Sequence, residues 1–166
     1  WVIQADGQNK VLAQTTPDTT SSRFPVAVVN DVTIADVDLS VRFRPISGRI
    51  DQAAGLVWRY RDQDNYYLVR ANALEGNIVM YKVERGRRTD LPIKGAGRTY
   101  GTSARVPGNQ WSTLRVIASG PRFEVWYNGA KLYEVADTTF TSAGKVGVWT
   151  KADSVTQFDD LAIVTR

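Results

Sequence analysis

The sequence contains neither cysteine nor histidine, and these two absences exclude a large part of enzyme chemistry. Without cysteine there is no disulfide framework and no thiolate nucleophile. Without histidine there is no Ser-His-Asp or Cys-His machinery and no imidazole ligand for zinc, copper or iron. A metal would have to bind to oxygen ligands, which favours calcium or magnesium. We therefore expect that no cofactor is required, with calcium as the metal to test.

Long hydrophobic runs are also absent, and no segment approaches the roughly 20 apolar residues of a membrane helix, so we expect no membrane insertion. The net charge is +4, but basic and acidic residues alternate, as in KVERGRRTD, residues 82–90. We do not expect nucleic-acid binding, because there is no compact basic block or recognised motif. A length of 166 residues and a hydrophobic content of 43% predict one globular domain, residues 1–166.

Short apolar runs separated by turn residues continue from Val26 to the end of the chain, and this spacing predicts an all-β sandwich or barrel. The run DVDLSVRF, residues 36–43, alternates strictly, as a half-buried strand does. Asn128 and Gly129 suit a type I′ hairpin turn. No segment has a sustained helical period with caps. We expect two antiparallel sheets of about six or seven strands each, with the final strand beside the first.

Arginine and asparagine interrupt the strands predicted between residues 54 and 84. If Tyr60 pairs with Tyr67, and Asn72 with Asn77, alternation divides the side chains between two faces. The core-like face carries Leu56, Trp58, Tyr60, Tyr67, Val69, Ala71, Ile78 and Met80. The other face carries Arg59, Tyr66, Leu68, Arg70, Asn72, Asn77, Val79 and Tyr81. Arginine and amide groups bind sugar hydroxyls, and aromatic rings stack on sugar C–H patches, so this second face is a candidate glycan site.

The assignment depends on register, because a slip of one residue exchanges the two faces. The same arginines also fit a solvent-facing sheet on which they pair with Glu75, Asp62 or Asp64. In VGVWTKADS, residues 146–154, Trp149 and Lys151 share a face with Gly147, and Gly147 is consistent with a close approach by another group. For such a pair, a packed tryptophan beside a snorkelling lysine is more common than a ligand platform.

Asp159 and Asp160 in FDDL are weak candidates for calcium ligands. Neighbouring strand residues point to opposite faces, so the two carboxylates do not easily act on one ion. A structural role, such as anchoring a loop, is the favoured interpretation.

Several segments resemble bacterial secreted or periplasmic domains of the concanavalin A-like lectin/glucanase superfamily. They are the opening WVIQADG, the run from Arg59 to Arg88, and the motifs NGAKLYEVAD, GKVGVWTKAD and FDDL. Within this superfamily, the segments resemble the laminin-G-like jelly rolls and the 3-keto-disaccharide hydrolase domains. The resemblance covers nearly the whole chain. It implies a two-sheet jelly roll with the ligand on its concave face, in a periplasmic or extracellular protein that includes other domains.

Glucanases of this fold carry paired carboxylates along one strand, which supply a nucleophile and a general acid. The four glutamates of this chain, Glu75, Glu84, Glu124 and Glu134, form no such cluster. The first hypothesis is therefore a non-catalytic, lectin-like module that binds an oligo- or polysaccharide. Its candidate ligand-binding residues are Arg59, Arg70, Asn72, Glu75, Asn77, Tyr81, Trp149 and Lys151.

Two alternatives remain open. The first is a glycoside or keto-sugar hydrolase with Glu75 as a lone acid or base, assisted by Lys151 or a metal, because a substrate with an acidified C–H bond needs less than two paired carboxylates. The second is a laminin-G-like adhesion or structural module that presents loops to a protein partner.

Overall fold

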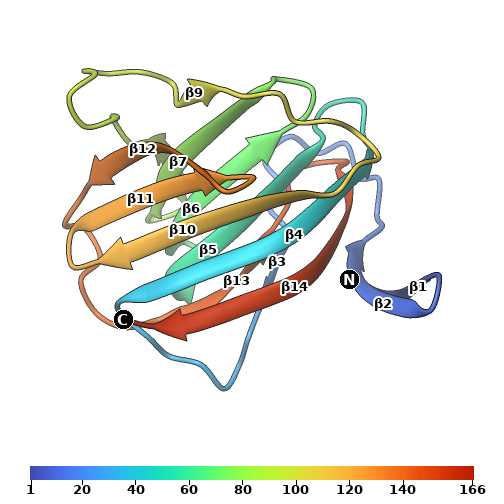
Figure 1. The fold of residues 1–166 in the computed structure, drawn as a ribbon, viewed down its shortest axis with the longest axis horizontal. Coiled ribbons are helices and arrows are strands. Elements are labelled where there is room, and N and C mark those ends of the chain that lie inside the picture. The colour runs from blue at the N-terminus through green and yellow to red at the C-terminus, as the bar shows by residue number, and fades with distance from the viewer.

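Fourteen strands and no helix make up the computed structural model, which describes residues 1–166 (Figure 1). The strands are β1 (Val2–Asp6), β2 (Asn9–Gln14), β3 (Val26–Val28), β4 (Val37–Ser47), β5 (Ala53–Asp62), β6 (Asn65–Asn72), β7 (Asn77–Glu84), β8 (Arg87–Asp90), β9 (Thr102–Ser103), β10 (Ser112–Ser119), β11 (Arg122–Tyr127), β12 (Ala130–Ala136), β13 (Lys145–Trp149) and β14 (Val155–Thr165). Because there is no helix, none could cross a membrane.

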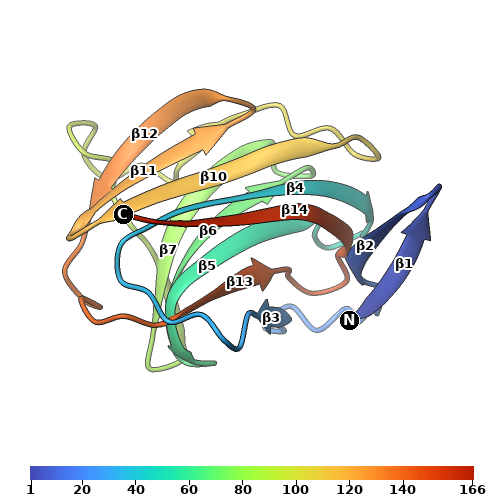
Figure 2. The ribbon, with the colours of Figure 1, turned by 60° about the horizontal axis from the view of Figure 1, so that its bottom comes forward.

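The strands form two antiparallel seven-stranded sheets, as the sequence predicts. Sheet A has the order β1-β2-β14-β4-β10-β11-β12. Sheet B has the order β3-β13-β5-β6-β7-β8, and β9 pairs with β7. The final strand β14 lies between β2 and β4, so the last strand of the chain is hydrogen-bonded to a strand near its beginning. Figure 2 shows the β1–β2 hairpin projecting from one end of the sandwich.

A core of 26 buried residues lies between the two sheets. Strand β4 shows how the sequence builds it, because Val37, Leu39, Val41 and Phe43 alternate with polar residues and are at most 1% exposed. Each such side chain stabilises the fold by about 1.5–3 kcal/mol through its removal from water. The hairpin predicted at Asn128 and Gly129 is also present, with β11 and β12 joined by these two residues in positive-φ conformations of 46° and 83°.

A bulge in β5 makes one sequence prediction wrong. Trp58, not Tyr60, pairs with Tyr67, and the register shifts before the next pair, Asp62 with Asn65. Arg59 lies in this bulge with a φ of 46°. The extra residue reverses, in this part of β5, the face of the sheet to which each side chain points. Arg59 therefore points toward the rim of the interior, and Tyr60 leaves the predicted core face to pack against Tyr66 on the outer face of sheet B, with ring centres 5.3 Å apart.

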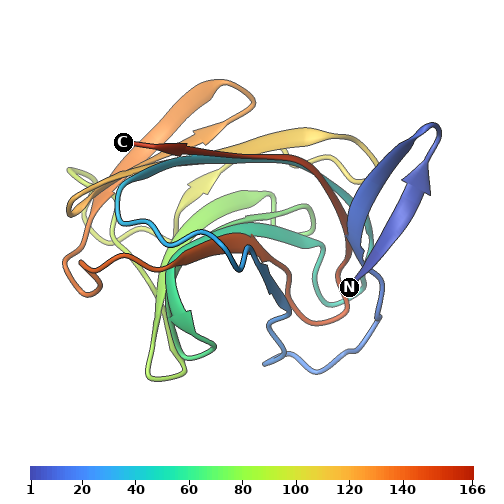
Figure 3. The ribbon, with the colours of Figure 1, turned by 90° about the horizontal axis from the view of Figure 1, so that it is seen from below.

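Both sheets bend in the same direction, as Figure 3 shows from below. The outer face of sheet B is therefore concave, and the outer face of sheet A is convex. The segment before β3 and the β7–β8 turn flank the concave face. Gly147 in β13 permits the close approach of β3, since a Cβ at this position would lie 2.1 Å from the carbonyl oxygen of Ala27.

Candidate functional site

The middle of the concave face is filled by the protein's own side chains. Eight buried residues form a second apolar cluster there: Ala53, Val57, Tyr66, Leu68, Val79, Tyr81, Val83 and Trp149. Phe24, from the segment before β3, stacks on Trp149 with ring centres 5.5 Å apart. The polar groups gather beside this cluster, at the end of the sheet where β6 ends and β7 begins.

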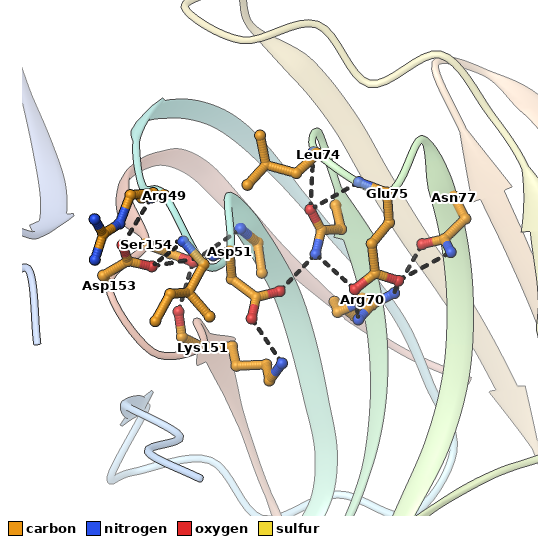
Figure 4. A network of polar contacts seen from close by, with 12 residues as sticks. Arg49, Asp51, Arg70, Leu74, Glu75, Asn77, Lys151, Asp153 and Ser154 are labelled. Atoms are coloured by element: carbon orange, nitrogen blue, oxygen red, sulfur yellow. Dashed lines mark hydrogen bonds and ion pairs between the residues drawn. The ribbon is translucent and has the colours of Figure 1, made fainter. Parts of the chain in front are cut away.

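A chain of hydrogen bonds and ion pairs crosses that end of the sheet (Figure 4). It links Lys151, Asp51, Asn72, Glu75, Arg70 and Asn77. At one end, Lys151 Nζ donates to Asp51 Oδ2 at 2.6 Å. In the middle, the Asn72 side-chain nitrogen donates to Asp51 Oδ1 at 2.6 Å and to Glu75 Oε1 at 3.1 Å. One amide therefore bridges two carboxylates, which we call the carboxylate bridge.

Arg70 occupies the other end of this chain. Its Nη1 donates to Glu75 Oε1 at 3.0 Å, and its Nη2 donates to Glu75 Oε2 at 2.8 Å. Nη2 also donates to Asn77 Oδ1 at 2.7 Å, and Asn77 Nδ2 donates to Glu75 Oε2 at 3.1 Å. Charge-assisted bidentate pairs of this kind are stronger than single neutral hydrogen bonds. The Glu75 carboxylate is thus fixed in orientation by three side chains.

The turn NALEGN, residues 72–77, places Glu75 over Arg70. The Asn72 side-chain oxygen accepts backbone N–H groups from Leu74 at 2.9 Å and Glu75 at 3.3 Å, which forms an Asx turn. Gly76 follows with a φ of 59°, a conformation that favours glycine. Asn72 and Asn77 then pair across β6 and β7, as the sequence predicts.

Asp153 holds the loop that carries Asp51, and the sequence analysis missed it. Its carboxylate accepts backbone N–H groups from Arg49 at 2.7 Å, Ile50 at 3.1 Å and Asp51 at 3.0 Å. Burial raises the pKa of Asp153, but these three hydrogen bonds outweigh it and hold the pKa below its usual value. The motif KADS gives no local sign of this role, because the partners lie about a hundred residues away.

Asp153→Ala should lower the free energy of unfolding by about 3 kcal/mol at neutral pH, since it leaves three backbone donors without an acceptor. The folded pKa is lowered, so this contribution is fully present above the unfolded pKa, near 3.8, and is lost as the pH falls through the folded pKa. Urea unfolding at about pH 7 and about pH 3 measures both effects. Asp31→Ala, at an exposed position, is the control. Equal urea midpoints for Asp153→Ala and wild type at neutral pH would contradict this role.

The charges of Glu75 and Arg70 are fixed at neutral pH. Burial raises the pKa of Glu75, but the hydrogen bond and charge of Arg70, with help from Asn77 and Lys151, bring it below its usual value. Burial lowers the pKa of the Arg70 guanidinium, but Tyr81 and Glu75 outweigh this effect and raise it. Glu75 is therefore a hydrogen-bond acceptor over a broad pH range and a weak general base.

Only part of the predicted residue set is accessible to a ligand. Five members are at most 2% exposed. Arg59 lies elsewhere in the fold, and the other four can act only as supports: Arg70, Asn72, Tyr81 and Trp149. The side chains of Glu75 and Lys151 are 36% and 16% exposed, and Asn77 is half-buried. Glu75, Asn77 and Lys151 are thus the predicted residues that face solvent.

The exposed aromatic ring beside this network is Tyr100, which the sequence analysis also missed. Tyr100 is 52% exposed, and its hydroxyl lies 2.6 Å from that of Tyr81. The Arg70 guanidinium lies 5.9 Å from the Tyr100 ring centre. The predicted stacking rings, Tyr81 and Trp149, are covered by Tyr100 and Phe24 respectively. A ring in an irregular loop has no strand alternation to reveal its direction, so pattern analysis did not find it.

Arg59 does not belong to this site, which corrects its predicted placement. Its guanidinium donates to the carbonyl oxygens of Ala35, Phe140 and Gly120 at 2.9, 2.7 and 2.7 Å. It also pairs with Asp36 Oδ1 at 3.0 Å. Arg59 is 1% exposed. It therefore ties three loops together at the rim of the sandwich.

Asp159 and Asp160 lie on sheet A, away from the concave face of sheet B. Asp159 accepts a hydrogen bond from Asn9 at 2.8 Å, and Asp160 pairs with Arg42 at 3.1 Å. No group of three or more acidic, histidine or cysteine side chains in the structure is arranged to hold a metal ion. Calcium binding stays a prediction for experiment.

The concave site is an open shelf, not a pocket. Four hollows occur in the structure, and none is lined by a residue of the network. One, of about 370 Å³, lies on the convex face and is lined by Asp38, Ser40, Thr113, Arg115, Trp126, Gly129, Ala162 and Val164. An open shelf suits a ligand that extends beyond the protein, whereas small substrates are usually enclosed.

A family model described as 3-keto-alpha-glucoside-1,2-lyase-like domain matches residues 3–164. The chain belongs to this family. No curated protein matches the sequence. The membership agrees with the resemblance seen in the sequence, and it covers both sheets and the whole of the polar network.

Solved structures confirm the jelly-roll sandwich of this family member. The carbohydrate-binding module CBM66 from Bacillus subtilis is 16% identical, with a TM-score of 0.71 over 92% of this chain and 98% of that one. The galectin LEC-6 from Caenorhabditis elegans is 15% identical, with a TM-score of 0.53 over 89% and 96%. The GH43 protein BlXynB from Bacillus licheniformis is 13% identical, with a TM-score of 0.65 over 94% of this chain but 33% of that one.

Proposed function

We propose that this chain is a carbohydrate-binding module that holds an oligo- or polysaccharide on the concave face of sheet B. The observation that carries the proposal is the carboxylate bridge with its flanking groups. It presents acceptors on Glu75, donors on Lys151, and both kinds on Asn77, all fixed by hydrogen bonds before a ligand arrives. Adjacent sugar hydroxyls need acceptors and donors side by side, and a fixed arrangement lowers the entropic cost of binding.

The exposed Tyr100 ring takes the stacking role that the sequence assigned to Tyr81 and Trp149. Its hydroxyl is held by Tyr81, which orients the ring beside the Arg70–Glu75 pair. An aromatic face contributes to sugar binding by covering the apolar C–H side of the ring while hydroxyls bind elsewhere. The sandwich shared with a carbohydrate-binding module and a galectin is consistent with this use of the fold. A secreted or periplasmic bacterial protein with further domains is the setting we propose for it.

The family model favours a second candidate, a lyase. Elimination between C1 and C2 of a 3-keto-glucoside requires a base for the C2 proton and an acid for the leaving oxygen. Glu75 would be the base, and Lys151, paired with the buried Asp51, would be a cation near the developing charge. Two features argue against this candidate. The pKa of Glu75 is lowered, whereas a general base works best with a pKa close to the working pH. The site is an open shelf, whereas an enclosed site keeps water from the reaction.

The two candidates make different predictions for one experiment. Wild type is incubated with an array of neutral and acidic polysaccharides and with 3-keto-glucosides, each with calcium and with chelator. We expect saturable glycan binding that chelator does not change, and no product. An elimination next to the C3 ketone leaves a conjugated enone, so near-ultraviolet absorbance would identify lyase activity. Absence of binding to every glycan would leave the laminin-G-like adhesion module as the remaining hypothesis.

A further inference from the structure

Arg88 reaches the concave face without an acidic partner, in contrast to Arg70 and Lys151. Arg88 lies opposite Val83 in the β7–β8 pair, so its side chain lies on the face that carries the second apolar cluster. Arg70 and Lys151 are ion-paired with Glu75 and Asp51. Arg88 makes no ion pair and no hydrogen bond in the structure, and its buried Nη1 has no acceptor.

Three aromatic rings hold the Arg88 guanidinium in place. Its central carbon lies 4.6 Å from the ring centre of Tyr81, 5.1 Å from Phe24 and 5.8 Å from Trp149. Trp149 belongs to β13, which is separated from β8 by β5, β6 and β7 in the sheet. The side chain therefore extends from the edge of the sheet across its concave face. Aromatic faces stabilise a cation but accept no strong hydrogen bond, so the hydrogen-bonding capacity of the guanidinium stays unused.

Arg88 is half-buried, and its Nη1 is the atom that is costly to the folded protein, since this atom loses hydration without gaining an acceptor. Asp90, two residues further along β8, is the nearest acid on the same face by sequence, but it pairs with Arg98 at 3.4 Å. The arrangement is explained if an anion from outside completes it. A guanidinium held beside aromatic rings, with unused donors, suits a carboxylate or sulfate that binds through two oxygens.

We propose that the glycan on this face is acidic and that Arg88 binds its carboxylate or sulfate group. This inference rests on the proposed function. The two arginines lie beside the same ring, because the guanidinium carbons of Arg70 and Arg88 are 5.5 and 4.6 Å from the ring centre of Tyr81. The charged group binds at Arg88 while hydroxyls of the same or the next sugar bind at Glu75 and Asn77. The charge preference thus belongs to Arg88, since Arg70 and Lys151 are neutralised by their own partners.

Matched polymers test the proposal. Polygalacturonate is compared with its carboxyl-reduced form, and chondroitin sulfate with its desulfated form, by titration calorimetry at two salt concentrations. Polyglutamate is a polyanion without sugar. Arg88→Gln removes the charge but keeps a polar side chain. Arg87→Gln, at the exposed neighbouring position, makes the same change in net charge and is the control. Melting temperatures and circular dichroism verify that each variant is folded.

We expect wild type to prefer at least one acidic polymer over its uncharged form by about tenfold or more, the effect of one charged hydrogen-bonded contact. Arg88→Gln should lose this preference and keep the affinity for the uncharged form, whereas Arg87→Gln should keep both. Equal binding of charged and uncharged forms by wild type would overturn the acidic-ligand inference and leave the proposed function standing. The acidic-ligand inference would also be overturned, with the proposed function left standing, if Arg88→Gln kept the preference for the charged polymer. The same holds if wild type bound polyglutamate as tightly as the acidic glycan. Binding to no glycan would reject both.

Discussion

Arg59→Ala should lower the free energy of unfolding by about 3–5 kcal/mol and leave glycan affinity unchanged. The substitution leaves the carbonyl oxygens of Ala35, Phe140 and Gly120 without this side-chain donor. It also removes the charged partner of Asp36, which keeps only the hydrogen bond from the Gly120 N–H. It also opens a space beside Phe123, whose ring centre lies 5.4 Å from the guanidinium carbon. The expected loss is a large share of the roughly 5–15 kcal/mol of a typical domain, so the variant should be folded but fragile.

Chemical denaturation measures the stability and calorimetry measures the affinity. Arg61→Ala, at the exposed position two residues further along β5, is the control and should lose far less stability. Arg59→Lys should fall between wild type and Arg59→Ala, because an ammonium cannot reach acceptors on three separate loops. If Arg59→Ala were as stable as Arg61→Ala but lost glycan affinity, Arg59 would be a ligand-binding residue after all.

Glu75→Gln should reduce glycan affinity by about tenfold to a hundredfold, since a hydrogen bond to a charged acceptor is worth about 1.5–3 kcal/mol. The glutamine has nearly the same shape, and its single oxygen can still accept from Arg70 Nη1 and Asn72. Its NH2 group replaces the oxygen that accepts from Arg70 Nη2 and Asn77, so these two donors lose this acceptor. The loss in affinity therefore combines the missing charge at the exposed end of the network with the loss of one acceptor oxygen.

Calorimetric titration with the best glycan from the array measures this effect. Glu84→Gln is the matched control, because it removes one negative charge from the far end of β7, the strand that follows the Glu75 turn, where Glu84 pairs with Lys82. The pH profile has a defined sign. The pKa of Glu75 is lowered, so affinity should be constant at neutral pH and fall only below about pH 4.5, as the carboxylate takes up a proton. If Glu75→Gln bound the glycan as tightly as wild type, Glu75 would not be a ligand-binding residue.

Alternation in the sequence predicts most of the sheet architecture, because side-chain direction in a strand has a fixed period of two. The pairing of Asn72 with Asn77 and the separation of Arg70 from the core-like residues are both confirmed in the structure. The prediction is wrong at Arg59, where one inserted residue reverses the alternation. No residue type in RYRD marks that bulge, so pattern analysis cannot place it.

The supporting residues of the site were harder to predict. Asp51 and Asp153 meet across about a hundred residues of sequence, and Tyr100 lies in a loop with no regular period. Arg88 is not among the predicted site residues, because its aromatic contacts come from segments that only the folded sheet brings together. The sequence identifies the strands that build the face, whereas the contacts that orient its polar groups come from loops and depend on the tertiary fold.

The most direct test of the central claim is a map of where a glycan binds. Backbone amide chemical shifts of the ¹⁵N-labelled protein are followed during titration with the tightest-binding glycan. Binding on the concave face predicts the largest changes in the turn 72–77, in the loop 48–52 and around residues 100 and 151. Changes confined to the convex face, around Thr113, Trp126 and Val164, would place the ligand in the hollow on sheet A and contradict the account.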